Sequence, residues 1–432
     1  MSDTPERAVT FLLTFLTTLA KRDLPLISLR HKPIDAYHAF EGDYDFITDS
    51  KKLNDILGIF HELATSHTIH YSINRTKYGK TKLWLYDTSK RYITLEIWTH
   101  LEIKEQAMLR SIFFDDLLPF IHDNRHFNSE FEALYYLSHL KTKKKNLATA
   151  EIQNRLQHYE ALIREHQEIA PLYATLLQEP NARDRVGSEA NLLLHRWGVL
   201  HRKTGAMKSK ETTQRFFTAL RRFKVQWLRA LPFIPVVGAD GVGKTSLIKG
   251  LQKQSQSNVR SFRFKTLFRH NILYQLSRPI LKRRLSEPME KNQYDDYFGS
   301  YMIFFALIKY PFALASAFVQ CRFYLSDRYF HDLILQDTRF KEKKAHLRQN
   351  WRSLLAKIPK NYWFIHLDAP TPLILSRKDE LNTEAINAYR HDIFVMYLEK
   401  PSCLYTYINT SRPQEECLEI LLQNARLQGI KT

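Results

Sequence analysis

Apolar residues follow two different periods in the first part of the chain. Helical spacing, with apolar residues three or four apart, is found at residues 7–19 and 51–64. Alternation of apolar and polar residues predicts strands in runs bounded by turn residues, at 24–29, 42–49, 67–74, 81–88 and 91–99. Residues 1–120 are therefore predicted to form an α+β domain.

The pattern then becomes helical and strongly charged over residues 121–225. Few Gly or Pro residues interrupt it, so the sequence predicts a helical connector rather than a flexible linker. Residues 226–432 alternate apolar runs with helical stretches and end in a helix that begins at Gln414. The apolar runs lie at 233–238, 322–326, 362–368 and 403–409, and helices fill the interval up to about residue 320. Strands that alternate with helices favour a parallel sheet covered on both faces, so this region is predicted to be an α/β domain.

One stretch has nearly the composition of a membrane span. Residues 302–320 are almost continuously apolar, but Lys309 and Pro311 interrupt them. The stretch only just reaches the ~20 residues that a bilayer crossing needs. A buried helix kinked at Pro311 is the simplest interpretation. A membrane span and a membrane-facing apolar surface are the alternatives.

Positive charge is concentrated in one part of the chain. The formal net charge is +19, and residues 201–290 contain 20 Lys or Arg but only 4 Asp or Glu. A concentration of this kind indicates an anionic partner, which is a nucleotide, a nucleic acid or an acidic membrane surface. The alternative is a solvated basic face with no specific partner.

The cysteines indicate a reducing environment. Cys321, Cys403 and Cys417 show neither a CxxC nor a Cys/His spacing, so reduced thiols are expected rather than disulfides or a zinc site. No signal peptide follows the first residues, MSDTPERAVT. A cytoplasmic location is expected.

A glycine-rich loop carries the chemistry. Residues 238–245, GADGVGKT, fit the phosphate-binding pattern GxxxxGK[ST] and lie between an apolar strand and a helix. The glycines let backbone N–H groups turn toward phosphate oxygens, at a helix N-terminus whose dipole favours anions. In such loops the lysine, here Lys244, bridges the β- and γ-phosphates, and the hydroxyl of Thr245 coordinates Mg²⁺. The amine of Lys244 is expected to face solvent until ATP binds.

This loop resembles that of the thymidylate kinase-like family, because Asp240 precedes Gly241. Further landmarks follow in order. The tetrapeptide SDRY at 326–329 resembles the family's DR[YH] signature, and LDAP at 367–370 resembles its LDxP strand. Residues 407–421, YINTSRPQEECLEIL, resemble the last strand, adenine-side loop and helix. The resemblance spans roughly residues 232–425 and implies a P-loop kinase fold that uses ATP and Mg²⁺.

The resemblance also implies roles for single residues. Asp240 would lie near the phosphoryl acceptor and accept or orient its proton, and Asp327 would help to hold Mg²⁺ and the acceptor. Arg328 would grip an anionic group of the acceptor, and Arg377, with Lys378, would close over the transferring phosphoryl group. The structural alternatives are a surface ion pair for Asp327 and Arg328 and a solvated helix face for Arg377 and Lys378.

The predicted site residues fall into three roles. The catalytic residues are Lys244, Asp240, Asp327, Arg328 and Arg377. The residues predicted to bind ATP are Gly238, Asp240, Gly241, Val242, Gly243, Lys244, Thr245, Ser246 and, in the adenine-side loop, Arg412. The predicted Mg²⁺ ligands are Thr245 and Asp327.

The chain also departs from the family. A thymidylate kinase is usually a single domain about half this length with an acceptor segment that reads like FxREPG, which is missing here. The corresponding stretch is basic and amphipathic and contains Arg263, Lys265 and Arg269. The acceptor is therefore expected to be another small anionic molecule: a different nucleotide, a sugar or a glycan precursor.

A second candidate site lies in the N-terminal region. Asp43 and Asp45 alternate along one strand and so share a side, and Glu96 lies in a later strand. A DxD pair with a third strand carboxylate resembles the metal triad of nucleotidyltransferase-like domains, although the Gly-Ser that opens the helix in that family is missing. A live metal site, a degenerate scaffold and a coincidence of surface acids all stay open.

The sequence thus predicts an α/β protein with a C-terminal P-loop kinase domain, a helical connector and an N-terminal nucleotidyltransferase-like domain. The expected activity is ATP- and Mg²⁺-dependent phosphoryl transfer to a small anionic acceptor. A regulatory or defence-type NTPase and a nucleic-acid-end kinase are the alternatives. Nucleic acid and peripheral membrane contact are additional partners to consider, and the sequence makes no prediction of the oligomeric state.

Overall fold

The computed structural model divides the chain into two compact units that are not consecutive in sequence. Unit 1 comprises residues 1–60, 77–83 and 93–220, and unit 2 comprises residues 61–76, 84–92 and 221–432. The residues described are 7–29, 43–75, 77–88, 91–105, 108–122, 125–200, 205–254, 259–263, 266–269, 272, 275, 276, 279, 299–320, 323–330, 358, 361–378, 382–399 and 404–427.

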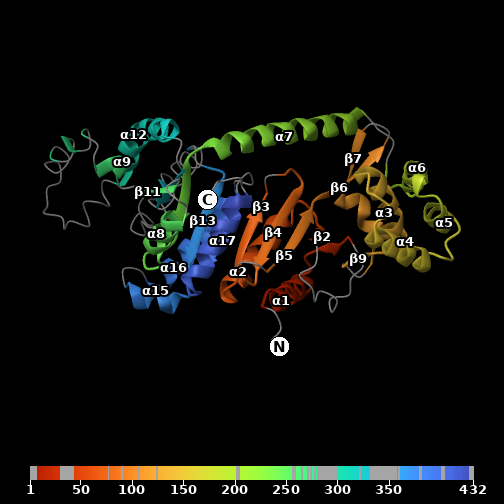
Figure 1. The fold of residues 1–432 in the computed structure, drawn as a ribbon, viewed down its shortest axis with the longest axis horizontal. Coiled ribbons are helices and arrows are strands. Elements are labelled where there is room, and N and C mark those ends of the chain that lie inside the picture. The colour runs from red at the N-terminus through yellow and green to blue at the C-terminus, as the bar shows by residue number, and fades with distance from the viewer. Residues whose placement is uncertain are drawn as a thin grey trace. The chain divides into compact units, whose positions relative to one another are not determined.

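Unit 1 contains short strands and a group of helices (Figure 1). Its strands are β1 (Ile27–Ser28), β2 (Asp43–Ile47), β5 (Tyr92–Trp98), β6 (His100–Glu105), β7 (Met108–Phe113), β8 (Ile121–His122) and β9 (His126–Phe127). Strand β5 belongs to unit 1 from Ile93 onward. Its helices are α1 (Arg7–Lys21), η2 (Phe114–Phe120), α3 (Ser129–Lys143), α4 (Ala150–Leu162), α5 (Ala170–Gln178), η3 (Pro180–Ala182) and α6 (Arg183–Arg196).

The strands of unit 1 follow the order β5-β2-β1-β9-β8, with β2 parallel to β5. The sequence pattern did not predict the antiparallel hairpin of β6 and β7. Leu101 and Ile112 of this hairpin belong to the same buried cluster as Phe131 of α3. Burying a side chain such as Phe131 contributes roughly 1.5–3 kcal/mol. Asn128 begins α3 by accepting a hydrogen bond from the Phe131 N–H at 2.9 Å.

Unit 2 is built on a sheet with the strand order β11-β12-β10-β13-β14-β3. Every pair from β11 to β14 is parallel, as the sequence predicts for this region. Its strands are β3 (His70–Asn74), β10 (Phe233–Val237), β11 (Val259–Arg263), β12 (Phe323–Asp327), β13 (Trp363–Asp368) and β14 (Leu404–Asn409). Its helices are α8 (Lys244–Gln254), α9 (Thr266–Arg269), α12 (Gly299–Val319), α15 (Thr371–Arg377), α16 (Thr383–Leu398) and α17 (Gln414–Leu427). Residues 259–263 were predicted to be helical, and their pairing with β12 shows that this prediction was wrong.

Strand β3 comes from the N-terminal part of the sequence but pairs antiparallel with β14. Tyr71 stacks on Tyr407 with ring centroids 5.1 Å apart. The hydroxyls of Ser72 and Thr406 lie 3.1 Å apart, and both are buried. The last strand of the parallel sheet is therefore covered by a segment more than 300 positions away in sequence.

Four of the described elements contribute residues to both units: α2 (Leu53–Ser66), β4 (Lys80–Tyr86), β5, whose first residue Tyr92 belongs to unit 2, and the 26-residue helix α7 (Gly205–Ala230). Figure 1 shows α7 as one long uninterrupted helix.

Helix α12 contains the apolar stretch singled out in the sequence, with Pro311 inside it. It buries Phe305, Ala306 and Tyr310 but exposes Phe312 and Val319. The prediction of a buried helix was therefore wrong for one of its faces. Over the described part of the chain, every helix is too short or too polar to cross a bilayer.

Candidate functional site

The glycine-rich loop joins the end of β10 to the start of α8. Gly238, Gly241 and Gly243 have φ angles of 153°, 93° and 86°, which side-chain-bearing residues rarely adopt. A Cβ atom on Gly238 would also lie 2.3 Å from the carbonyl oxygen of Leu367 on β13. The loop can therefore curl closely against the neighbouring strand only with glycine at this position.

Lys244, the first residue of α8, folds its side chain back into the loop. Its Nζ donates to the carbonyl oxygens of Gly238 at 2.7 Å and Ala239 at 2.9 Å, and it lies 3.4 Å from Oδ1 of Asp240. The side chain is only 7% exposed. The expectation that this amine faces solvent was wrong, because the curled loop points carbonyl oxygens at it.

Three cationic side chains, from separate parts of unit 2, lie close to the carboxylate of Asp240. Its carboxylate accepts hydrogen bonds from Arg328 Nη2, and it lies 3.4 Å from Lys244 Nζ and 3.6 Å from Lys378 Nζ. Burial alone would raise the pKa of Asp240, but these cations outweigh burial and lower the pKa to about 2. Asp240 is therefore ionised at neutral pH.

Arg328 reaches Asp240 from an unusual backbone conformation. It follows β12 directly and has a φ of 70°, in the left-handed region. Two bonds support this turn: the N–H of Arg328 donates to the Val236 carbonyl at 3.2 Å, and Ser326 Oγ donates to the carbonyl of Arg328 itself at 2.6 Å. A non-glycine residue held in this region costs of order 1 kcal/mol, and such residues are enriched at functional sites.

These residues line a cavity of about 360 Å³ at the carboxyl ends of the parallel strands. Its walls are formed by Asp240, Gly241, Gly243, Lys244, Thr245, Ser246, Arg263, Asp327, Arg328 and Lys378. Four of the lining side chains are cationic and two are carboxylates. The excess of positive charge, next to a helix N-terminus, suits a polyanionic ligand.

Arg263 and Asp327 lie side by side on this wall, because they are register partners on the adjacent strands β11 and β12. In the sequence, Arg263 stands out only as part of a basic stretch. Since the segment was expected to be helical, nothing in the pattern placed Arg263 beside Asp327. Lys265 lies outside the described residues.

The two basic residues at the end of α15 have different positions. Arg377 Nη1 donates to the Gly241 carbonyl at 3.3 Å and is exposed, whereas Lys378 lines the cavity. Sequence reasoning gave the main role to Arg377, and the structure brings Lys378 closer to Asp240.

Arg412 was predicted to contact ATP, but it is not among the described residues that line this cavity. Its guanidinium donates to Glu416 Oε1 at 2.6 Å and Oε2 at 3.2 Å and to the carbonyl of Asp87 at 3.3 Å. These bonds tie the loop after β14 to α17 and to residues 84–92 of the same unit. Val242, also predicted to contact ATP, is fully buried.

A buried polar network packs against the glycine-rich loop at 238–245 and helps to hold it. Arg390 of α16 donates from Nε to Asp368 Oδ2 at 2.5 Å and from Nη2 to Oδ1 at 3.0 Å. Tyr407 also donates to Asp368, at 2.8 Å. Tyr389, beside Arg390, accepts a hydrogen bond from the N–H of Gly238 at 3.0 Å. Sequence reasoning identified Asp368 only as part of a motif and found no signal for Tyr389 or Arg390.

The carboxylates of the second predicted site face lysines. Asp45 and Glu96 are register partners on β2 and β5. Glu96 pairs with Lys80, and its Oε1 lies 3.2 Å from Lys82 Nζ, which is also 3.6 Å from Asp43 Oδ1. Burial would raise the pKa of Glu96, but the two lysines outweigh burial and lower it. Among the described residues, no three acidic, His or Cys side chains are grouped closely enough to hold a metal ion.

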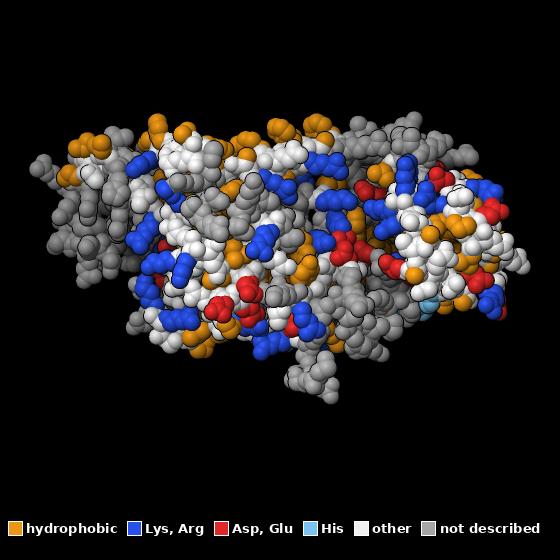
Figure 2. Space-filling model, in the orientation of Figure 1, with side chains coloured by type: hydrophobic (Ala, Val, Ile, Leu, Met, Phe, Trp, Pro, Cys, Tyr) orange, Lys and Arg blue, Asp and Glu red, His pale blue; other side chains and the backbone are white. Residues whose placement is uncertain are grey.

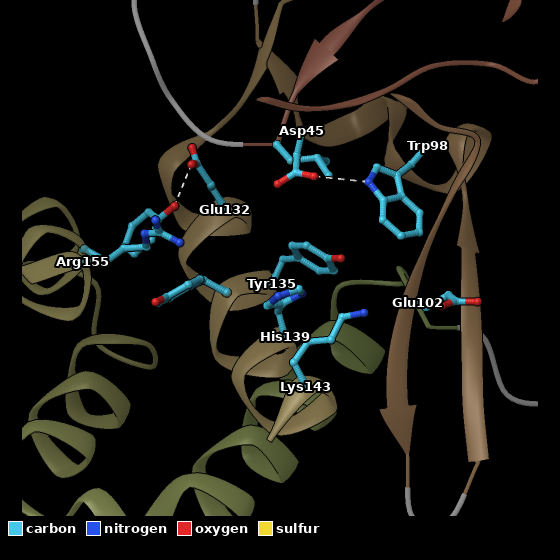
Figure 3. A pocket seen from close by; sticks show the side chains of 11 residues that line it. Asp45, Trp98, Glu102, Glu132, Tyr135, His139, Lys143 and Arg155 are labelled. Carbon is cyan, nitrogen blue, oxygen red and sulfur yellow. Dashed lines mark hydrogen bonds between the residues drawn. The ribbon is translucent and has the colours of Figure 1, made fainter. Parts of the chain in front are cut away.

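Asp45 instead lines a small cavity of about 70 Å³ in unit 1, where it accepts a hydrogen bond from Trp98 Nε1 at 3.4 Å (Figure 3). Glu132, which also lines this cavity, accepts a hydrogen bond from Tyr159 at 2.7 Å. The complete lining is Leu29, Asp45, Trp98, Glu102, Glu132, Tyr135, Tyr136, His139, Lys143, Arg155 and Tyr159.

Comparisons with known proteins give a partial likeness to solved structures. No family model matches the sequence, and no curated protein matches it. Among solved structures, the chain is similar to a thymidylate kinase from Ehrlichia chaffeensis, with a TM-score of 0.30 and 15% sequence identity. The match covers 45% of this chain and 97% of that one.

Proposed function

We propose that unit 2 is an ATP-dependent phosphotransferase that transfers the γ-phosphoryl group to a small anionic acceptor. The observation that carries this proposal is the cationic cavity built around the loop at 238–245. Backbone N–H groups at the start of α8 have no partners within the helix and so are suited to bind phosphate oxygens. Lys244 adds charge that a triphosphate would compensate, and Arg328 adds charge for an anionic group of the acceptor.

Lys244 must exchange partners when ATP binds. Its amine is held by two loop carbonyls and by Asp240, and phosphate oxygens are stronger acceptors than the two carbonyls because they are charged. Moving the amine onto the β- and γ-phosphates would leave Asp240 paired mainly with Arg328 and Lys378. The loop would therefore respond to nucleotide by redistributing cations rather than by recruiting new ones.

The donor set fits Mg²⁺. Thr245 and Asp327 both line the cavity and offer a hydroxyl and a carboxylate, the hard oxygen ligands that Mg²⁺ prefers. When bound, the ion would neutralise charge on the phosphates. The part left to the protein is to hold the reactants and to place positive charge where negative charge develops.

Asp240 is proposed to orient rather than to abstract a proton. A general base works best when its pKa lies near the operating pH, and the pKa of Asp240 is about 2. Its contact with Arg328 fixes the direction of that guanidinium, which would grip an anionic group of the acceptor. Arg263 and Lys378 would extend the anion-binding wall.

For unit 1 we propose a nucleotidyltransferase-like scaffold that does not hold catalytic metal ions. Lys80 and Lys82 already supply positive charge to Glu96 and Asp43. Two ammonium groups beside these carboxylates would repel a divalent cation. The residues of this region therefore do not fit the metal triad, and we assign no reaction to it.

The phosphotransferase proposal is tested with Lys244→Ala and the matched control Lys249→Ala, an exposed residue on the same helix. Radiolabelled ATP is offered with Mg²⁺ and a panel of nucleotides, sugars and lipid-linked sugars. We expect wild type and Lys249→Ala to label one acceptor class, and Lys244→Ala to lose roughly ten- to a hundredfold or more in rate. ATP hydrolysis without labelling of any acceptor would instead favour a regulatory NTPase, and equal rates in both variants would contradict the site.

A further inference from the structure

Helix α7 carries a row of large apolar side chains that are at least half exposed to solvent. Phe216, Leu220, Phe223 and Trp227 are 63%, 50%, 69% and 50% exposed. Their spacing of four, three and four residues places them on one side of the helix, over roughly 16 Å of its length. We call these four residues the α7 stripe. In Figure 2, orange side chains stand along the upper edge, where Figure 1 shows α7.

The stripe is not the face by which α7 packs against the protein. Val225 and Leu228 are buried, at 7% and 9% exposure, and they lie on the other side of the helix at ~100° per residue. The helix therefore has two apolar faces. The smaller one is buried, and the larger one, the α7 stripe, is exposed to solvent. A row of exposed aromatic side chains of this kind marks an interaction surface.

The charge of α7 selects the partner. Its sequence holds seven Lys or Arg residues and one acidic residue, Glu211. Arg222 and Lys224 are exposed beside the stripe. A basic helix with Trp, Phe and Leu on one face is the pattern of helices that lie in the interface of an anionic bilayer. Trp in particular favours that interface.

A second copy of the same helix fits this surface less well. The stripe has heptad spacing, but it covers only two heptads, and its positions hold aromatic residues rather than the Leu, Ile and Val of stable coiled coils. Two copies would also bring like charges together, because basic residues dominate the sequence of α7.

We propose that α7 binds the surface of an anionic lipid bilayer, with the α7 stripe among the upper acyl chains and Arg222 and Lys224 at the headgroups. This inference is independent of the reaction proposed for unit 2. It depends on the helix itself, whose residues 205–230 form one continuous element.

The test is co-sedimentation of the full-length protein with vesicles of phosphatidylcholine, with or without phosphatidylserine. Wild type is expected to sediment with the phosphatidylserine vesicles and to be released by added salt. The double variant Phe223→Ser, Trp227→Ser is expected to lose roughly tenfold or more in vesicle partitioning. Leu192→Ser on α6, where Leu192 is 60% exposed, is the matched control and is expected to bind like wild type.

A second variant separates charge from apolar insertion. Arg222→Glu, Lys224→Glu is expected to weaken binding to phosphatidylserine vesicles while the far-ultraviolet circular dichroism spectrum stays unchanged. Wild type that stays in the supernatant with every vesicle, or a stripe variant that sediments like wild type, would overturn the proposal. So would dimerisation or oligonucleotide binding that depends on the stripe in a protein that ignores vesicles.

Discussion

Arg328 Nη2 donates to both carboxylate oxygens of Asp240, across 88 positions of sequence. The two residues come from the turn after β12 and from the glycine-rich loop, so their contact fixes one strand end against the other. Lys244 and Lys378 approach the same carboxylate. This arrangement concentrates positive charge on one wall of the cavity. A single carboxylate, that of Asp240, holds the three cationic side chains in place.

Asp240→Asn is expected to reduce stability at neutral pH. The pKa of Asp240 falls from 3.8 to about 2 on folding, so its ion pairs stabilise the protein above the unfolded pKa, by about 2 kcal/mol. This contribution is lost as pH falls from about 4 through 2, so the difference between the variants should shrink in that window. Urea unfolding at neutral pH and at several acidic pH values measures it, and a difference that does not vary with pH would contradict the ion-pair account.

Arg328→Gly and Arg328→Ala are expected to differ in stability but not in activity. Both remove the guanidinium, so the KM for the acceptor should rise roughly ten- to a hundredfold while ATP affinity changes little. Glycine adopts the left-handed backbone of this position freely, whereas alanine does not, so the Gly variant should be more stable by about 1 kcal/mol. Steady-state kinetics and thermal unfolding of the two proteins check both parts. A fall in ATP affinity instead would move Arg328 to the nucleotide side.

Glu96→Gln is expected to destabilise unit 1 at neutral pH by roughly 1–3 kcal/mol, because the ammonium groups of Lys80 and Lys82 both lose the carboxylate of Glu96 and Asp43 compensates only Lys82. The pKa of Glu96 is lowered in the folded protein. Its stabilising effect is therefore fully present above pH 4.5, the pKa of the unfolded state, and disappears as the pH falls through the lowered pKa of the folded state. Glu151→Gln, where the side chain is 77% exposed, is the control.

A related measurement concerns metal ions. Because lysines already neutralise these carboxylates, adding Mg²⁺ or Mn²⁺ should not raise the melting temperature of unit 1 in the absence of nucleotide. A metal-dependent increase that is lost in Glu96→Gln would restore the metal triad.

The sequence predicted those parts of the site whose structure depends on local residue types. The loop at 238–245 depends on glycine backbone freedom, which is visible in the residue types themselves. Strands with mainly apolar runs, such as β13, were also found, because every residue of β13 is buried and burial on both faces favours this pattern.

Long-range pairing was not visible in the same way. Arg263 was missed because its segment is short and largely exposed, so neither period marks β11 as a strand. Tyr389 and Arg390 read as ordinary helical residues, and only the folded chain brings them to Gly238 and Asp368. The pairing of β3 with β14 depends on chain topology, about which alternation carries no information.

The pairing of β3 with β14 also leads to a prediction about whether the region around the glycine-rich loop can fold alone. A fragment of residues 226–432 contains the glycine-rich loop and all the parallel strands of unit 2 but lacks β3. Without β3, one edge of β14 would be open: Tyr405 and Tyr407 would lose their contacts with Tyr71, and the backbone groups of β14 that pair with β3 would lose their partners. An exposed apolar edge of this kind favours aggregation. The fragment is therefore expected to be insoluble or to bind a hydrophobic dye without a cooperative melting transition.

The matched control protein joins residues 61–92 through a flexible linker to residues 221–432, which restores the segments of unit 2. It is expected to be soluble and to unfold cooperatively, because it regains the bonds of Ser72 to Thr406 and Asn424 and the bond that His70 Nδ1 accepts from the N–H of Asn409. Burial lowers the pKa of His70 to about 3, so this ring stays neutral and able to accept at neutral pH. If the 226–432 fragment alone melts as cooperatively as the joined protein, β3 is dispensable. The P-loop region would then fold without help from the N-terminal sequence.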